Sequence, residues 1–255
     1  MCAAAVKPAH PARRIAGMNG GARSSPWWYR RRGTVIGAIY GLGFLAGNIS
    51  FDGTRPVPAF ELWGGDRVLW LAVASALCAW LWRASGTAYL RRDVVFAADV
   101  QRDRLIVAGV FRYVRNPLYL GNMFLALGIA VLASPLGFAA IVAGNAAIVW
   151  LLAAEEAREL EQRYGAAYAA YRAAVPAFLP RLTPADVAGS LTVAPDWPHA
   201  LIGEGFCFAL AVAIVPIALF GAAGVPAFWA IWVAAFVIFA YNGWRAGRAQ
   251  RGPST

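Results

Sequence analysis

The chain has 255 residues, of which 60% are hydrophobic and only 14% are charged, and its mean hydropathy is +0.54. Soluble domains carry roughly a quarter charged residues, so this composition excludes an ordinary soluble protein and predicts an integral membrane protein. The net charge of +10 does not indicate a nucleic-acid partner, because the arginines flank apolar stretches and suit anionic lipid headgroups instead.

Composition shifts divide the chain into five segments. Residues 1–32 form a basic N-terminal tail that we expect to be disordered, and residues 33–100 hold N-terminal transmembrane helices with a cytoplasmic connection. Residues 101–182 combine a helical hairpin with an amphipathic helix, and we interpret them as the functional core. Residues 183–202 are a Pro-rich linker, and residues 203–255 form a C-terminal transmembrane hairpin with a basic tail.

Six apolar stretches have about the length needed to cross roughly 30 Å of hydrocarbon. These are residues 33–50, 67–84, 117–134, 136–156, 203–221 and 225–244. The predicted fold is therefore an all-α, polytopic transmembrane helical bundle. Arginine-rich loops alternate with poorly basic ones, so both termini are predicted on the cytoplasmic side, and the arginine- and alanine-rich composition indicates a bacterial inner membrane.

The third and fourth stretches are separated only by Ser134-Pro135, which predicts an antiparallel hairpin. The entry to the first arm, residues 115–117, should then lie beside Glu155 and Glu156 of the second arm, with helix axes roughly 8 to 10 Å apart. Beyond the glutamates, the apolar spacing through residue 174 predicts that the second arm continues as one amphipathic helix, ended by Val175-Pro176.

Opposite charges meet at this corner of the predicted hairpin. Asn116 before Pro117 has the form of a helix N-cap, and free N–H groups there, with Arg112 and Arg115 nearby, suit a carboxylate. Glu155 and Glu156 suit an ammonium group, and an amino-acid moiety carries both charges. Two plainer interpretations stay open: Asn116-Pro117 as an ordinary helix start, and the glutamates as solvated members of helical ion pairs.

Two long motifs resemble a known family. The string 109–121, GVFRYVRNPLYLG, is similar to the G-x-[FY]-R-[YF]-x-R-[HN]-P-x-Y-x-G signature of the isoprenylcysteine carboxyl methyltransferase and phospholipid methyltransferase superfamily. Residues 155–176 resemble the E-E-x-x-L-x-x-x-[FY]-G-x-x-Y-x-x-Y-x-x-x-V-P run of the same superfamily. The two motifs stand in the right order and are separated by one helical hairpin.

The resemblance implies an S-adenosylmethionine-dependent methyltransferase with a cofactor cleft at the cytoplasmic face and a lipophilic, isoprenoid or lipid-like acceptor. It implies that Arg115 and Asn116 are catalytic. Asn116 stands where the carboxyl methyltransferases usually have a histidine, so this position cannot titrate near neutrality. The cofactor-binding residues that the resemblance implies are Arg112, Tyr113, Asn116, Pro117, Tyr119, Gly121, Glu155, Glu156, Tyr164, Tyr168 and Tyr171.

Other functions give different expectations. The two histidines and three cysteines are too scattered for a metal site, so no metal is expected. The expected partners are membrane lipids and a lipophilic acceptor, and no nucleic acid. The membrane sterol and enone reductases, which use a nicotinamide cofactor, are a second enzyme class with a related helical bundle. A non-catalytic membrane scaffold is the third alternative.

Overall fold

A computed structural model describes residues 26–46, 57–90, 105, 107–187 and 194–250. Within these ranges every regular element is a helix, and no strand occurs. The prediction of an all-α fold is therefore confirmed. Most of the basic tail predicted over residues 1–32 lies outside the described residues, but Trp27–Arg30 form the short helix α1.

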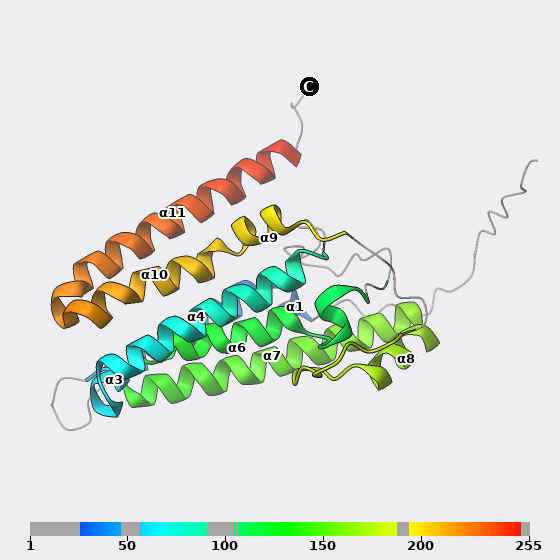
Figure 1. The fold of residues 1–255 in the computed structure, drawn as a ribbon, viewed down its shortest axis with the longest axis horizontal. Helices are drawn as coiled ribbons and strands as arrows, with labels where there is room; N and C mark the ends of the chain where they lie inside the picture. The colour runs from blue at the N-terminus through cyan, green and yellow to red at the C-terminus, as the bar shows by residue number, and fades with distance from the viewer. Residues whose placement is uncertain (1–25, 47–56, 91–104, 106, 188–193, 251–255) are drawn as a thin grey trace, which may run out of the picture.

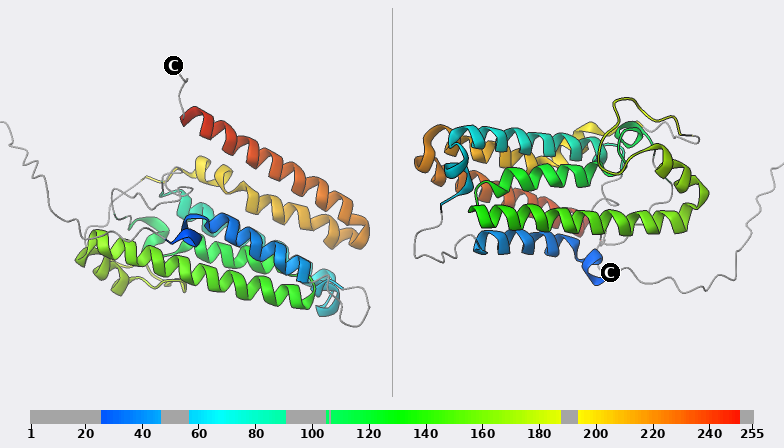
Figure 2. Two further views of the ribbon diagram at one scale, coloured as in Figure 1. Left: turned by 180° about the vertical axis from the view of Figure 1, so that it is seen from behind. Right: turned by 90° about the horizontal axis from the view of Figure 1, so that it is seen from below.

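Three helices that run side by side make the centre of the bundle (Figure 1). They are α4 (Asp66–Thr87), α6 (Pro117–Ala130) and α7 (Pro135–Tyr164). The helix α2 (Arg32–Ala46) lies against α7, and α3 (Ala59–Trp63) precedes α4 at one end of the bundle (Figure 2). The predicted hairpin of α6 and α7 is confirmed. Its turn is held by Ser134, whose Oγ accepts a hydrogen bond from the Gly137 N–H at 3.2 Å.

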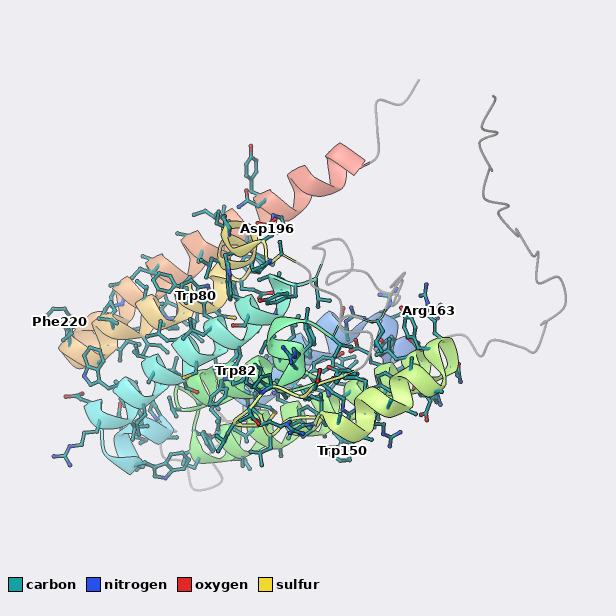
Figure 3. All side chains as sticks on the ribbon, turned by 45° about the vertical axis from the view of Figure 1, so that its right-hand side comes forward. Trp80, Trp82, Trp150, Arg163, Asp196 and Phe220 are labelled. Atoms are coloured by element: carbon teal, nitrogen blue, oxygen red, sulfur yellow. The ribbon has the colours of Figure 1, made fainter. Side chains whose placement is uncertain are left out.

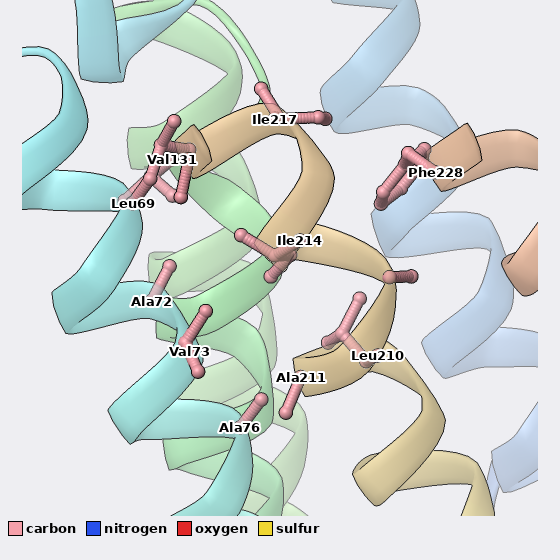
Figure 4. Close-up of a cluster of buried hydrophobic side chains, with 12 residues drawn as sticks. Leu69, Ala72, Val73, Ala76, Val131, Leu210, Ala211, Ile214, Ile217 and Phe228 are labelled. Atoms are coloured by element: carbon pink, nitrogen blue, oxygen red, sulfur yellow. The ribbon is translucent and has the colours of Figure 1, made fainter. Parts of the chain in front are cut away.

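The C-terminal hairpin packs on the outside of α4. It consists of α10 (Gly205–Phe220), the turn η2 (Gly221–Gly224) and α11 (Val225–Gln250). Apolar side chains from α4 and α10, among them Leu69, Val73, Leu210 and Ile214, form the largest buried cluster with Phe228 of α11 (Figure 4). The predicted linker over 183–202 contains the start of a helix, α9 (Trp197–Gly203), which leads into α10.

Three helical segments are long and apolar enough to cross a membrane by length and composition. They are Asp66–Thr87, Pro135–Tyr164 and Gly205–Asn242, and the last one includes both arms of the C-terminal hairpin. Two further apolar helices, α2 and α6, are shorter. At 1.5 Å per residue, the 14 residues of α6 cover about 21 Å. Each of the six predicted intervals contains a helix, but these lengths leave the number of spans a prediction.

The expected continuous helix from the second arm through residue 174 is wrong. The chain breaks at Gly165, whose φ of +52° is one that glycine adopts without steric cost, and α7 ends at Tyr164. A separate helix, α8 (Ala166–Ala174), follows and turns back toward the bundle (Figure 2). The apolar spacing predicted a helix on both sides of Gly165, but it carries no information about a change of direction at one residue.

Candidate active site

The start of α6 and the second glutamate of α7 face one small cavity, which we call the corner cavity. It is lined by Leu105, Phe111, Arg115, Asn116, Glu156, Leu160, Tyr168 and Tyr171. The predicted meeting of the two helix ends is therefore confirmed. The cavity volume is about 20 Å³, which is room for one water molecule, so the corner is closed in this structure.

Arg115 and Asn116 are both bonded to the loop that follows α8. The backbone N–H groups of Arg115 and Asn116 donate to the carbonyls of Pro176 and Ala177 at 2.9 and 3.2 Å. The Arg115 Nε donates to the Val175 carbonyl at 2.8 Å, and the Asn116 Nδ2 donates to the Ala177 carbonyl at 3.1 Å. These bonds fix the entry to α6 against residues 175–177.

Asn116 occupies the N-cap position of α6, as predicted, but its side chain makes no capping hydrogen bond. The side-chain amide is turned instead toward Ala177, on the loop after α8. The Asn116 side chain thus bonds to Ala177 and not to an N–H group of its own helix. No pattern within residues 112–120 could indicate this distant partner. The first turn of α6 keeps N–H groups that the Asn116 side chain does not satisfy.

Two tyrosines of α8 close the corner cavity from the other side. The Arg115 Nη1 donates to the Tyr168 hydroxyl at 3.2 Å, and the Tyr171 hydroxyl donates to the Phe111 carbonyl at 2.8 Å. Both rings are buried. Burial raises the pKa of Tyr168 above its ordinary value of 10, while the Arg115 guanidinium acts in the opposite direction. Tyr168 is therefore a neutral hydroxyl at physiological pH.

The paired glutamates are separated by the geometry of α7. Consecutive residues of a helix point about 100° apart, so two neighbours can have different surroundings. Glu156 lines the corner cavity. Glu155 is 8% exposed and forms an ion pair with Arg158, one turn along the same helix. Glu155 therefore does not line the corner cavity, and the helical ion pair applies to it. The binding of one ligand by both carboxylates stays a prediction.

The remaining residues implied by the resemblance do not line the corner cavity. Arg112 donates from Nε to the Ala185 carbonyl at 2.9 Å, and the Tyr113 carbonyl accepts from the Arg181 N–H at 3.0 Å. Pro117 is buried at the start of α6, and Tyr164 packs on the apolar cluster around Tyr168 and Leu160. These positions hold the loops of the site together.

Two predicted cofactor-binding residues of α6 face other helices. Tyr119 packs against the buried cluster of Tyr29, Ile148 and Leu152. Gly121 lies against α4 so closely that a Cβ there would be 2.4 Å from Cγ of Arg83 and 3.0 Å from the Ala79 carbonyl. The glycine is therefore needed for the approach of α6 to α4 at this level of the bundle.

A buried polar network that no sequence motif indicated joins three helices, and we call it the Arg83 network. The Arg83 Nε lies 2.7 Å from Oε2 of Glu204, and its Nη1 donates to the Asn122 Oδ1 at 2.6 Å. The Thr87 hydroxyl donates to Oε1 of Glu204 at 2.8 Å. The network joins α4 and α6 to Glu204 at the start of α10, which is 117 residues from Thr87. The one sequence signal for such a network is an arginine near the end of an apolar stretch.

Residues 68–167 match the sequence model of a family described as phospholipid methyltransferase. The match confirms the resemblance found in the sequence and extends it back to include α4. Comparison with curated proteins and with solved structures gave no match.

A methyltransferase family and three long apolar helices together indicate an integral membrane protein. Among the described residues, no group of three or more His, Cys, Asp or Glu side chains could hold a metal ion.

Proposed function

We propose that this chain is an integral membrane methyltransferase that uses S-adenosylmethionine and acts on a lipophilic, isoprenoid or lipid-like acceptor. The observation that carries the proposal is the corner cavity, which Glu156 lines together with Arg115 and Asn116. All three residues belong to the segment that matches the methyltransferase family.

The chemistry of these side chains fits the amino-acid end of such a cofactor. The Glu156 carboxylate would accept hydrogen bonds from the ammonium group. The first-turn N–H groups of α6 that the Asn116 side chain does not satisfy, with the second hydrogen of the Asn116 amide, would donate to the carboxylate. When bound, S-adenosylmethionine supplies a methyl group already activated by its sulfonium. The protein then has to align the acceptor and exclude water, and it needs neither a nucleophilic side chain nor a metal.

A volume of about 20 Å³ cannot hold this cofactor, so binding requires the corner cavity to open. The wall made by α8 follows α7 through Gly165, which has a positive φ, and α8 is also held to α7 by the ion pair of Arg172 with Glu161. We infer that α8 swings away from α7 about this glycine. The hydrogen bond from the Arg115 Nη1 to Tyr168 and the Glu161–Arg172 ion pair are released in that movement, and the Nη1 donor of Arg115 becomes available to the ligand.

The proposed setting is a bundle with six spans in a bacterial inner membrane. Both termini and the corner cavity lie on the cytoplasmic side, so the water-soluble cofactor enters from the cytoplasm. Helix α6 is short for a span, and its buried glycines and alanines place it inside the bundle rather than against lipid.

Calorimetric titration of the purified full-length protein with S-adenosylmethionine tests the proposal. We expect saturable binding, and we expect Glu156→Gln to weaken it about 10- to 100-fold, as for loss of a charged hydrogen bond of about 1.5–3 kcal/mol. A labelled-methyl assay with a lipid extract then tests for transfer. Titration with NADPH is the control for a reductase, and no heat of binding is expected.

Glu61→Gln is the matched variant, because it removes the same charge at an exposed position of α3 that does not line the corner cavity. It should bind the cofactor as the unaltered chain does. The proposal is wrong if the unaltered protein does not bind S-adenosylmethionine, or if the Glu156 and Glu61 variants bind it equally well.

A further inference from the structure

A second and much larger cavity lies on the outer side of α4, and we call it the outer cavity. Its volume is about 650 Å³, within the range of small-molecule sites. One wall is formed by Cys78, Leu81, Trp82 and Ser85 of α4, and another by η1 (Gly109–Arg112) with Tyr113. Trp82 is labelled in Figure 3. Arg181, from the loop after α8, and Trp197, at the start of α9, also line the outer cavity.

One short segment separates the outer cavity from the corner cavity. Phe111, Arg115 and Asn116 line the corner cavity, whereas Val110 and Tyr113 of the same segment line the outer cavity. The two cavities adjoin across residues 109–116. Methyl transfer needs the donor methyl carbon and the acceptor atom in direct contact, about 3–3.5 Å apart. The opening that admits the cofactor must therefore also join the two cavities across this segment.

The partition between the cavities is held in place by close packing. Gly109 has a φ of +55°, and a Cβ there would lie 2.1 Å from the ring of Tyr89, which itself lines the outer cavity. The backbone of η1 therefore rests directly on this ring. Arg181 is tied to the same segment, because its N–H donates to the Tyr113 carbonyl at 3.0 Å.

Arg181 gives the outer cavity a positively charged end. Its Nη1 donates to the Ala174 carbonyl at 2.7 Å and its Nε to the Thr183 carbonyl at 3.3 Å. A guanidinium has five N–H donors, so these two bonds orient the group and leave donors for a ligand. Within the ranges that the structure describes, no carboxylate forms an ion pair with Arg181, which therefore suits an anionic ligand.

The other end of the outer cavity meets the apolar outer face of α4. Leu81 lines the cavity and is 54% exposed, and Trp70 and Leu71, about three turns earlier, are 45% and 69% exposed. In a membrane protein such side chains contact acyl chains. A ligand can therefore place a charged head beside Arg181 and an apolar chain along α4.

We propose that the outer cavity binds the methyl acceptor, and that the acceptor is an amphiphile whose anionic headgroup is held by Arg181. This inference rests on the proposed methyltransferase function. Arg181, Pro180 and Trp197 lie beyond the family match, which ends at residue 167, so this wall of the cavity is particular to the chain's own C-terminal part.

Photolabelling of the full-length protein in lipid nanodiscs tests the site directly. The probes are an alkyl phosphate and an alkyl glucoside with the same diazirine-bearing chain, followed by peptide mapping. We expect the phosphate probe to label residues 78–85 and 109–113, with a yield at least tenfold above that of the glucoside. Arg181→Gln should lower the phosphate yield about tenfold, and Arg181→Lys should retain most of it.

Arg31→Gln is the matched control, because it removes an exposed arginine next to α1, away from the outer cavity. Its labelling should equal that of the unaltered chain. Equal labelling of the unaltered protein by both probes overturns the inference even if the Arg181 variants do not fold, and so does undiminished phosphate labelling of a folded Arg181→Gln.

The labelling needs no methyl donor, so its result is separate from the test of function. Selective labelling in a protein that fails to bind S-adenosylmethionine would support an anionic amphiphile site and overturn its role as acceptor site. Methyl transfer by a protein with unselective labelling would uphold the function and overturn the role of Arg181.

Discussion

The corner cavity and the Arg83 network each bring arginine and glutamate together from different helices, but they are built in opposite ways. In the Arg83 network, Glu204 is 3% exposed and receives hydrogen bonds from both Arg83 and Thr87, while Asn122 takes a further donor of Arg83. At the corner, Glu156 and Arg115 line a cavity, and Arg115 donates hydrogen bonds to the Val175 carbonyl and the Tyr168 hydroxyl.

The difference teaches how charge is used in an apolar bundle. A charge pair enclosed by protein must be satisfied internally, because each unsatisfied charge in a low-dielectric interior is costly. Such a pair holds helices together. A charge that borders a cavity can instead exchange a partner within the protein for a ligand. The Arg83 network therefore docks the C-terminal hairpin onto α4 and α6, and the corner cavity is where binding is expected.

The largest expected effect comes from breaking the enclosed pair. Glu204→Ala leaves the Arg83 guanidinium buried without its counter-charge, and we expect a loss of about 3–5 kcal/mol in the free energy of unfolding. Denaturant unfolding of the purified protein in micelles measures it. Glu61→Ala, at an exposed position of α3, should stay within about 0.5 kcal/mol of the unaltered chain.

The double replacement Arg83→Met with Glu204→Met sharpens the comparison. It removes both charges together, so we expect it to recover much of the stability lost in Glu204→Ala. If the single Glu204 variant is as stable as the unaltered protein, the network is not what docks α10, and the contrast between the two clusters fails.

An intermediate effect is expected where α6 meets Arg83. Gly121→Ala places a Cβ 2.4 Å from Cγ of Arg83 and 3.0 Å from the Ala79 carbonyl, so the helices must separate. We expect a cost of about 1–3 kcal/mol, typical of overpacking, in the same unfolding experiment. Gly37→Ala is the control, because no heavy atom lies within 4 Å of its added Cβ, and this variant should not lose stability.

That substitution also separates two interpretations of Gly121. If the glycine serves helix packing, stability falls while the affinity of the folded protein for S-adenosylmethionine is unchanged. If the variant keeps its full stability but loses affinity for S-adenosylmethionine, Gly121 has the cofactor-binding role that the resemblance implies.

The smallest effect concerns the pH dependence of the corner cavity. The pKa of Tyr168 is raised in the folded protein, so above about pH 10 the unfolded chain loses this proton first, and folding stability falls as pH rises. Tyr168→Phe lacks this contribution. We expect the stability difference between the two proteins to be constant below pH 9 and to shrink above pH 10. A constant difference up to pH 11 would contradict a raised pKa.

The periodicity of apolar residues and the two motifs determined much of this protein from sequence alone. The helical class, the α6–α7 hairpin and the meeting of Asn116 with a glutamate all follow from local rules and from one short turn at Ser134-Pro135. These features could be predicted because a helix has a fixed rise, so two arms joined by a tight turn must return to the same level.

Only the tertiary structure decided which side chains face the corner cavity and what else they bind. The turn at Gly165 places Tyr168 and Tyr171 against the cavity. The Asn116 amide donates to the Ala177 carbonyl instead of capping α6. Glu204, from a distant segment, pairs with Arg83. A backbone turn at one glycine, or a contact across more than 100 residues, leaves no periodic trace in the sequence. Its position is set by the packing of the whole bundle.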